Sequence, residues 1–129
     1  MAPRFNEPLF VISVAARLVE MHPQTLRKYE REGLIAPSRT TGNLRLYSDR
    51  DIERLRQVKY LVEERGLNLA GVQIALDMTQ VLLDLRDRLS KSNEKLERES
   101  ATAAELTGSI QHLDLSLALL GYIPLRERP

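Results

Sequence analysis

The sequence predicts a mainly α-helical protein in two parts, a compact N-terminal domain and a long coiled-coil helix. Short amphipathic segments separated by turn residues fill roughly the first 78 of the 129 residues. A segment rich in Ser, Thr and Gly interrupts them near residue 40, and from about Thr79 leucines recur at seven-residue spacing. This length suffices for one small domain plus an extension.

Two short helices are expected first. Ser13 can cap a helix that carries an apolar face through residue 21. A proline at the first helical position starts a helix well, so Pro23 is expected to open a second helix that runs to Glu32. Gly33 then supplies a left-handed C-terminal cap. Two short helices joined by a brief turn predict a helix-turn-helix.

A β-hairpin is expected directly after these helices. Pro37 stops helix formation, and the stretch "SRTTGNLRLY" is typical of two short strands around Thr41, Gly42 and Asn43. A hairpin in this position is a wing.

The rest of the domain is expected to be helical. Ser48 and Asp51 form a capping box that opens a helix through about Arg65. Asn68 can cap a further helix that ends at about Asp77. The sequence therefore predicts an N-terminal arm over residues 1–8 and a winged helix-turn-helix domain over residues 9–78.

Residues 79–120 are expected to form a coiled-coil helix, followed by a tail over residues 121–129. Ten of the twelve seam positions counted from Leu82 are apolar, which is a strong coiled-coil signal. One continuous helix would span about 58 Å at roughly 1.5 Å per residue. Polar seam residues and Gly108 leave open a bend or break between about 90 and 108. The small domain cannot bury this stripe, so a second copy is expected to pair through Leu82, Leu85, Leu89, Leu96, Ala103, Leu106, Ile110, Leu113, Leu117 and Leu120.

Composition excludes several classes of function. There are no cysteines, so disulfides, thiolate metal sites and thiol redox sensing are excluded, and a cytoplasmic location is expected. His22 and His112 are far apart, so no metal site is expected. There is no glycine-rich phosphate loop and no nucleophile–histidine pair, so we expect neither a cofactor nor an enzyme. No apolar run is long enough for a membrane span, and the N-terminus is not a secretory signal.

Positive charge is concentrated in one stretch. Residues 22–47 hold 5 Lys or Arg against 2 Asp or Glu, although the net charge of the chain is only +1. With Leu26 and the Tyr29 ring facing inward, the polar face of the second helix suits the major groove of DNA. Gln24 and Thr25 are the expected base readers, and Lys28 and the Tyr29 hydroxyl suit phosphates. The full set of expected DNA-binding residues is Ser13, Gln24, Thr25, Arg27, Lys28, Tyr29, Arg31, Arg39, Asn43 and Arg45.

A solvated helix face, with arginines paired to Glu30 and Glu32, is the alternative interpretation. A coiled-coil adaptor whose winged helix binds protein is a further alternative. Sequence preference in binding to duplex DNA would separate an adaptor from a regulator.

The stretch "TLRKYEREGLIAPSRTTGNLRLYSDRDIERL" resembles the MerR family of bacterial transcription regulators. Lys28 and Leu46 depart from residues frequent in that family. The resemblance implies a homodimer held by a long C-terminal helix in an antiparallel coiled coil and bound to double-stranded DNA. The matching positions are Leu26, Arg27, Tyr29, Glu30, Gly33, Leu34, Pro37, Arg39, Arg45 and Tyr47.

Within the family, "ISVAARLVEMHPQTLRKYEREGLIAP" and "RQVKYLVEERGLNLAGV" are most similar to heat-shock repressors of the HspR type. That resemblance implies repression of chaperone genes at inverted-repeat operators, with a DnaK-type chaperone as co-repressor. The tail "LGYIPLRERP" is a candidate chaperone site, although it can also fold back on the protein. Glutamine-responsive nitrogen regulators of the same family are the alternative.

Overall fold

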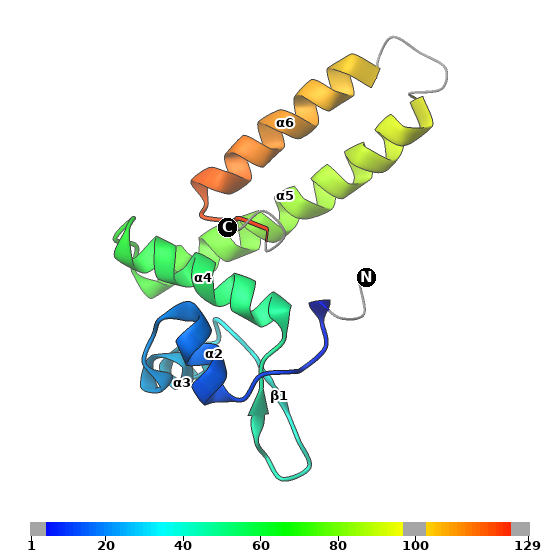
Figure 1. Ribbon diagram of the computed structural model, residues 1–129. Helices are drawn as coiled ribbons and strands as arrows, with labels where there is room; N and C mark the ends of the chain where they lie inside the picture. Colours follow the sequence, from blue (N-terminus) through cyan, green and yellow to red (C-terminus); the bar gives the residue numbers. More distant parts are fainter. Residues whose placement is uncertain (1–4, 97–102, 125–129) are drawn as a thin grey trace.

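The computed structural model describes residues 5–96 and 103–124. Helix α4 crosses the middle of the molecule, with α2, α3 and a small hairpin on one side and two long antiparallel helices on the other (Figure 1). The elements are α2 (Ile12–Val19), α3 (Pro23–Arg31), β1 (Ser38–Arg39), β2 (Arg45–Leu46), α4 (Asp49–Glu63), α5 (Leu69–Leu96) and α6 (Ala103–Leu119).

Most of the predicted helix boundaries are confirmed. Ser48 and Asp51 form the expected capping box at the start of α4. Gly33 follows α3 with a φ of +78°, a conformation that costs glycine little. The Asn68 side chain accepts a hydrogen bond of 2.8 Å from the backbone N–H of Gly71 in the first turn of α5. The prediction that Ser13 caps α2 is wrong, because the helix starts two residues earlier, at Ile12, and its cap position is Val11, which offers no side-chain acceptor.

The wing is present as predicted and is joined to the N-terminal segment. Strands β1 and β2 pair antiparallel with Ser38 opposite Leu46. Asn43 adopts a φ of 64° in the connecting turn, as its short polar side chain allows. Phe10 forms a β-bridge with Tyr47, so the residues leading into α2 extend the hairpin.

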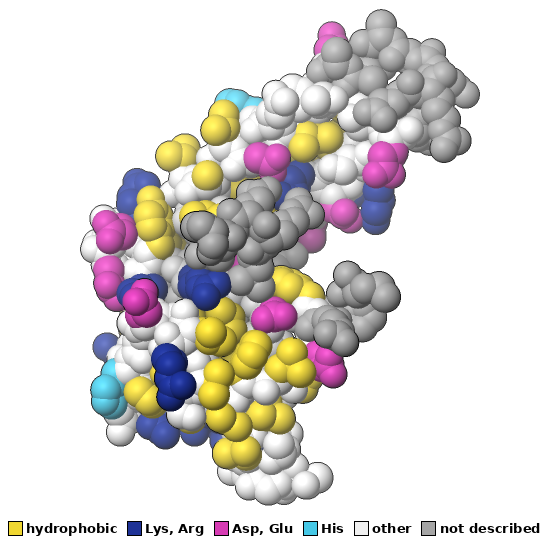
Figure 2. Space-filling model, viewed as in Figure 1, with side chains coloured by type: hydrophobic (Ala, Val, Ile, Leu, Met, Phe, Trp, Pro, Cys, Tyr) yellow, Lys and Arg dark blue, Asp and Glu magenta, His cyan; other side chains and the backbone are white. Residues whose placement is uncertain are grey.

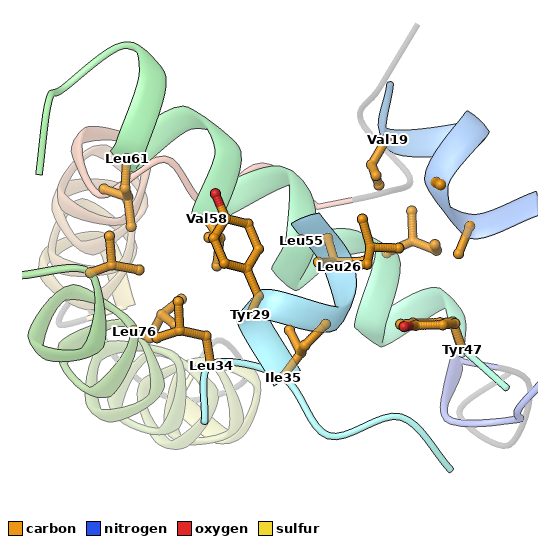
Figure 3. Close-up of a cluster of buried hydrophobic side chains, with 14 of the residues drawn as sticks. Val19, Leu26, Tyr29, Leu34, Ile35, Tyr47, Leu55, Val58, Leu61 and Leu76 are labelled. Atoms are coloured by element: carbon orange, nitrogen blue, oxygen red, sulfur yellow. The ribbon is translucent and has the colours of Figure 1, made fainter. Parts of the chain in front are cut away.

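One hydrophobic core unites α2, α3, the hairpin and α4 with the start of α5. Leu26 and Tyr29 of α3 point toward Leu55 and Val58 of α4 (Figure 3). Because these side chains are buried, the opposite face of α3 is left to solvent. The core residues are Ala15, Ala16, Val19, Leu26, Tyr29, Leu34, Ile35, Tyr47, Ile52, Leu55, Val58, Leu61, Val72, Ala75 and Leu76.

Cationic side chains of α4 also satisfy backbone groups of the elements that carry the site. The Lys59 ammonium donates to the carbonyls of Val19 and Glu20 at 3.2 Å, where α2 ends. The Arg54 guanidinium donates to the Leu34 carbonyl at 2.6 Å, just beyond α3. Carbonyls at a helix end lack partners within the helix, so α4 fixes the helix-turn-helix by hydrogen bonds as well as by packing.

The second part of the chain differs from a single long helix. The helix expected to end at about Asp77 continues as α5 to Leu96, and the chain then returns as α6 along α5 (Figure 1). The break thus falls inside the interval left open at residues 90–108. Arg86 pairs with Asp114 at 3.0 Å, and Asn93 donates to Thr107 at 3.1 Å, so polar contacts fix the register of the two helices.

Many leucines of the seven-residue repeat are covered within one chain. Leu117 is buried, and six other members are half-buried. Leu85 is exposed, and the side chains of Leu96 and Ala103 lie outside the described residues. The half-buried members are Leu82, Leu89, Leu106, Ile110, Leu113 and Leu120.

The end of α6 is attached to the outer side of α4. The buried Gln57 amide donates to the Thr79 hydroxyl at 2.8 Å and to the Leu120 carbonyl at 3.0 Å, which connects α4, α5 and α6. Gly121 is buried against the Tyr60 ring with a φ of +84°. The helical pair is therefore built onto the winged domain through α4.

We predict that Gly121→Ala destabilises the protein by at least about 1 kcal/mol. A Cβ at this position would overlap the Tyr60 ring, and the positive φ disfavours any side chain. Thermal or urea unfolding measures the effect.

Gly108→Ala is the matched control, because a Cβ at Gly108 meets no atom within 4 Å. This substitution inside α6 should stabilise the protein by up to about 1 kcal/mol. Equal stability of the two variants would show that the end of α6 does not pack closely on α4.

Candidate nucleic-acid interface

The exposed face of α3 carries the predicted contact residues. Gln24, Lys28 and Arg31 are exposed, and Thr25 and Arg27 are half-buried beside them. Gln24 and Thr25 lie in the first turn, which is the end of a recognition helix that reaches base edges. The hydrophobic burial of Leu26 and Tyr29 therefore presents the predicted polar face outward.

His22 caps this helix, a role that the sequence analysis missed. Its imidazole Nδ1 accepts a hydrogen bond of 3.1 Å from the backbone N–H of Gln24. Pro23, the next residue, needs no hydrogen-bond acceptor because proline has no N–H. A histidine directly before a proline at a helix start was the available signal, but histidine is not among the common capping residues.

The Tyr29 ring belongs to the core, as expected, and a phosphate contact by its hydroxyl remains a prediction. The residue is only 6% exposed, and its ring packs beside Val58 (Figure 3). Burial raises the pKa of the Tyr29 hydroxyl, and the nearby charge of Glu63 raises it further.

The two wing arginines share one carboxylate on α3. Glu30 accepts from Arg45 Nε at 2.6 Å and from Arg39 Nη2 at 2.9 Å. Burial alone would raise the pKa of Glu30, but the hydrogen bonds from Arg45 and Arg39 outweigh it and hold the pKa below its ordinary value. Glu30 is therefore ionised at neutral pH. The alternative interpretation foresaw such Arg–Glu pairs at Glu30, and here they join the wing to α3.

The remaining predicted residues lie on neighbouring elements. Ser13 is exposed in the first turn of α2, which packs against α3. Asn43 is exposed at the turn of the wing, and its backbone carbonyl accepts from Arg39 Nη1 at 3.2 Å. The expected contact residues thus lie on three adjacent elements, α2, α3 and the wing. Among the described residues, no helix is both long and apolar enough to traverse a membrane.

A polar helix face beside a wing with basic side chains is a surface suited to duplex DNA. A major groove admits an α-helix, and basic side chains on a flanking hairpin can meet phosphates. Residues 10–79 match the MerR HTH family regulatory protein model. The chain belongs to the MerR family of DNA-binding transcription regulators. It is a regulator and not an enzyme, and this membership argues against the adaptor alternative.

Similarity to individual regulators extends beyond this domain. The chain is 42% identical over 122 residues to the heat shock protein HspR of Streptomyces coelicolor, covering 95% of this chain and 80% of that protein. It is 34% identical over 103 residues to the regulator GlnR of Bacillus anthracis, covering 80% of this chain and 74% of that protein. The regulator MlrA of Escherichia coli is 36% identical over 74 residues, or 57% of this chain and 30% of that protein.

We predict that His22→Ala destabilises the protein by about 0.5–2 kcal/mol, whereas His22→Asn changes its stability much less. Alanine removes the acceptor for the Gln24 N–H, and asparagine supplies another in the same place. Urea unfolding compares the two variants. Equal losses of stability would mean that the histidine acts through packing and not as a cap.

Proposed function

We propose that the protein is a homodimeric repressor of heat-shock or chaperone genes that binds inverted-repeat operators. The observation that carries this proposal is the extent of the similarity to HspR. A match over 122 residues cannot lie within the 70 residues of the family domain alone. It must therefore include much of α5 and α6, the part of the chain that would distinguish one subfamily from another.

A glutamine-responsive nitrogen regulator is the second candidate. The similarity to GlnR also extends past the family domain, over 103 residues. At 34% identity and 80% coverage it is the weaker of the two matches. The heat-shock assignment is therefore preferred.

The roles of the contact residues follow from their places on α3. Gln24 is exposed in the first turn of α3, where an amide side chain can make paired hydrogen bonds to adenine. Thr25 beside it is a second candidate base reader. Lys28 and Arg31 are exposed one and two turns further on, where a positive charge suits the DNA backbone.

An apolar stripe on α5 is the surface that we assign to the second copy. Ile74, Met78, Val81 and Leu85 are 61%, 51%, 65% and 39% exposed. They recur at spacings of four and three residues, so they share one helix face, as in a coiled-coil seam. Hydrophobic side chains also show at the surface of α6 (Figure 2), where Leu115 and Leu119 are exposed.

The stripe differs from the predicted seam. Of the predicted dimerisation residues, only Leu85 belongs to it, because many of the others are covered between α5 and α6. Burial of these apolar side chains between two copies of the chain would supply favourable free energy for dimerisation. A two-fold dimer would place its recognition helices on the two half-sites of an inverted repeat.

We predict that Val81→Glu shifts the protein toward monomers while its helix content is retained. Sedimentation and circular dichroism measure both properties. Gln80→Lys is the control, since it places a charge one residue away on another face of α5, where the Asp84 carboxylate that now accepts from Gln80 can pair with it. If Val81→Glu remains as dimeric as the wild type, the stripe is not the dimer interface.

A DnaK-type chaperone is the proposed co-repressor, as the HspR resemblance implies. In the tail, Gly121 is buried and Tyr122 half-buried, whereas Ile123 is 45% exposed. Burial raises the pKa of the Tyr122 hydroxyl, and Glu53 on α4 adds to this. Tyr122 thus contributes to the attachment of α6, and the proposed chaperone segment starts at Ile123. Residues 125–129 of the tail lie outside the described residues.

The function is tested by selecting genomic fragments of the source organism that the purified protein binds. We predict that promoters of chaperone genes are recovered and that they contain an inverted repeat. Recovery of nitrogen-assimilation promoters would establish the second candidate instead. Fragments with no shared sequence would contradict operator recognition.

The recovered operator then serves to test the co-repressor. Titration with and without purified DnaK should show tighter operator binding in its presence, and coupling requires that operator strengthens DnaK binding by the same factor. A chain ending at Pro124 keeps Tyr122 in place, so a loss of enhancement in this variant would show that the chaperone site requires residues 125–129. No enhancement with the intact chain would contradict the co-repressor role.

A further inference from the structure

We propose that Glu30 is a positioning residue for DNA binding, holding the wing at a fixed orientation to α3 and aiming Arg45 at the DNA backbone. A carboxylate beside a DNA-binding surface would ordinarily oppose binding, because it repels phosphate. The contacts of Glu30 indicate the opposite effect. This inference rests on the DNA-binding function of the family and adds a role that lies outside the predicted contact residues.

Each oxygen of Glu30 holds one strand of the wing. Arg39 lies on β1 and Arg45 on β2, and these two residues face each other in the hairpin. Arg45 Nε donates to one carboxylate oxygen at 2.6 Å, and Arg39 Nη2 donates to the other at 2.9 Å. The Glu30 side chain is 22% exposed, so water screens these ion pairs only in part.

The hairpin needs such an attachment because it is very short. Each strand has two residues, and an isolated two-stranded hairpin is marginally stable at best. The bridge between Phe10 and Tyr47 fixes the base of the wing. Glu30 fixes the hairpin further along, at the facing pair Arg39 and Arg45. A charge-assisted hydrogen bond is roughly twice as strong as a neutral one, so two of them hold the wing firmly.

The geometry gives the two arginines different tasks. Arg39 donates through one amino group to Glu30 and through the other to the Asn43 carbonyl, so it braces the turn of the wing. Arg45 contacts Glu30 through Nε, and its two terminal amino groups extend beyond that contact. A guanidinium carries five N–H donors in a fixed plane. Holding Nε therefore sets the direction of the amino groups that would donate to phosphate.

The test compares Glu30→Gln with Glu32→Gln. Both substitutions remove one negative charge near the end of α3, but Glu32 is exposed and follows the last residue of the helix. Binding is measured to an operator duplex recovered by the wild-type protein and to a scrambled duplex of the same composition, at several salt concentrations. Sequence discrimination by the wild type is thus established before either variant is measured. Hydrogen exchange of the free variants reports on the wing amides of Thr40 and Leu44, which are bonded across the hairpin.

We expect Glu30→Gln to weaken operator binding by roughly tenfold or more, as expected for one lost charge-assisted hydrogen bond. The salt dependence at the operator should fall by about 0.9 in log–log slope, which corresponds to one phosphate contact. Affinity for the scrambled duplex should stay the same or rise, and the wing amides should exchange faster. Glu32→Gln should strengthen binding to both duplexes slightly.

Two results would overturn the proposal. If Glu30→Gln strengthens binding to both duplexes as Glu32→Gln does, Glu30 is only a repulsive charge. The other is that Glu30→Gln weakens binding to both duplexes in the same proportion, lowers the melting temperature and leaves the salt slope unchanged. In that case Glu30 serves only the stability of the fold.

Discussion

The burial of α4 on two sides is the constraint on which the rest of the structure depends. One side packs Leu55 and Val58 against Leu26 and Tyr29 of α3. The other side holds the end of α6 through the buried amide of Gln57. Because one helix supports both parts, a change in the packing of α5 and α6 can reach α3 through a single rigid element.

This arrangement explains how a small chain holds the exposed face of α3 and the wing in a fixed position. Hydrophobic burial fixes which face of α3 is exposed, and the His22 cap fixes where the helix begins. The wing lacks a core of its own, so its orientation depends on the bridge between Phe10 and Tyr47 and, in our proposal, on the ion pairs of Glu30. The surface that we propose to meet DNA is thus determined by buried leucines underneath and by one partly buried carboxylate at its edge.

The sequence predicted those features whose signals are local. The capping box at Ser48, the glycine after α3 and the hairpin turn each arise within a few residues, and all three are confirmed. The pairing of α5 with α6 could not be predicted, because a seven-residue apolar repeat can be buried within one chain or between two. The Glu30 contacts span 9 and 15 residues, and the sequence offered Glu30 and Glu32 as equal partners. Ser13 was misassigned because this good capping residue is the second residue of the helix, two positions after the actual cap.

The central claim is that α3 and the wing bind DNA as one unit held together by Glu30 and α4. The most direct measurement is a crystal structure of the protein bound to an operator duplex. It should show the first turn of α3 in the major groove, with the terminal amino groups of Arg45 on a phosphate and its Nε still bonded to Glu30. A duplex bound to another face, or a wing that leaves Glu30 to reach the DNA, would contradict the account.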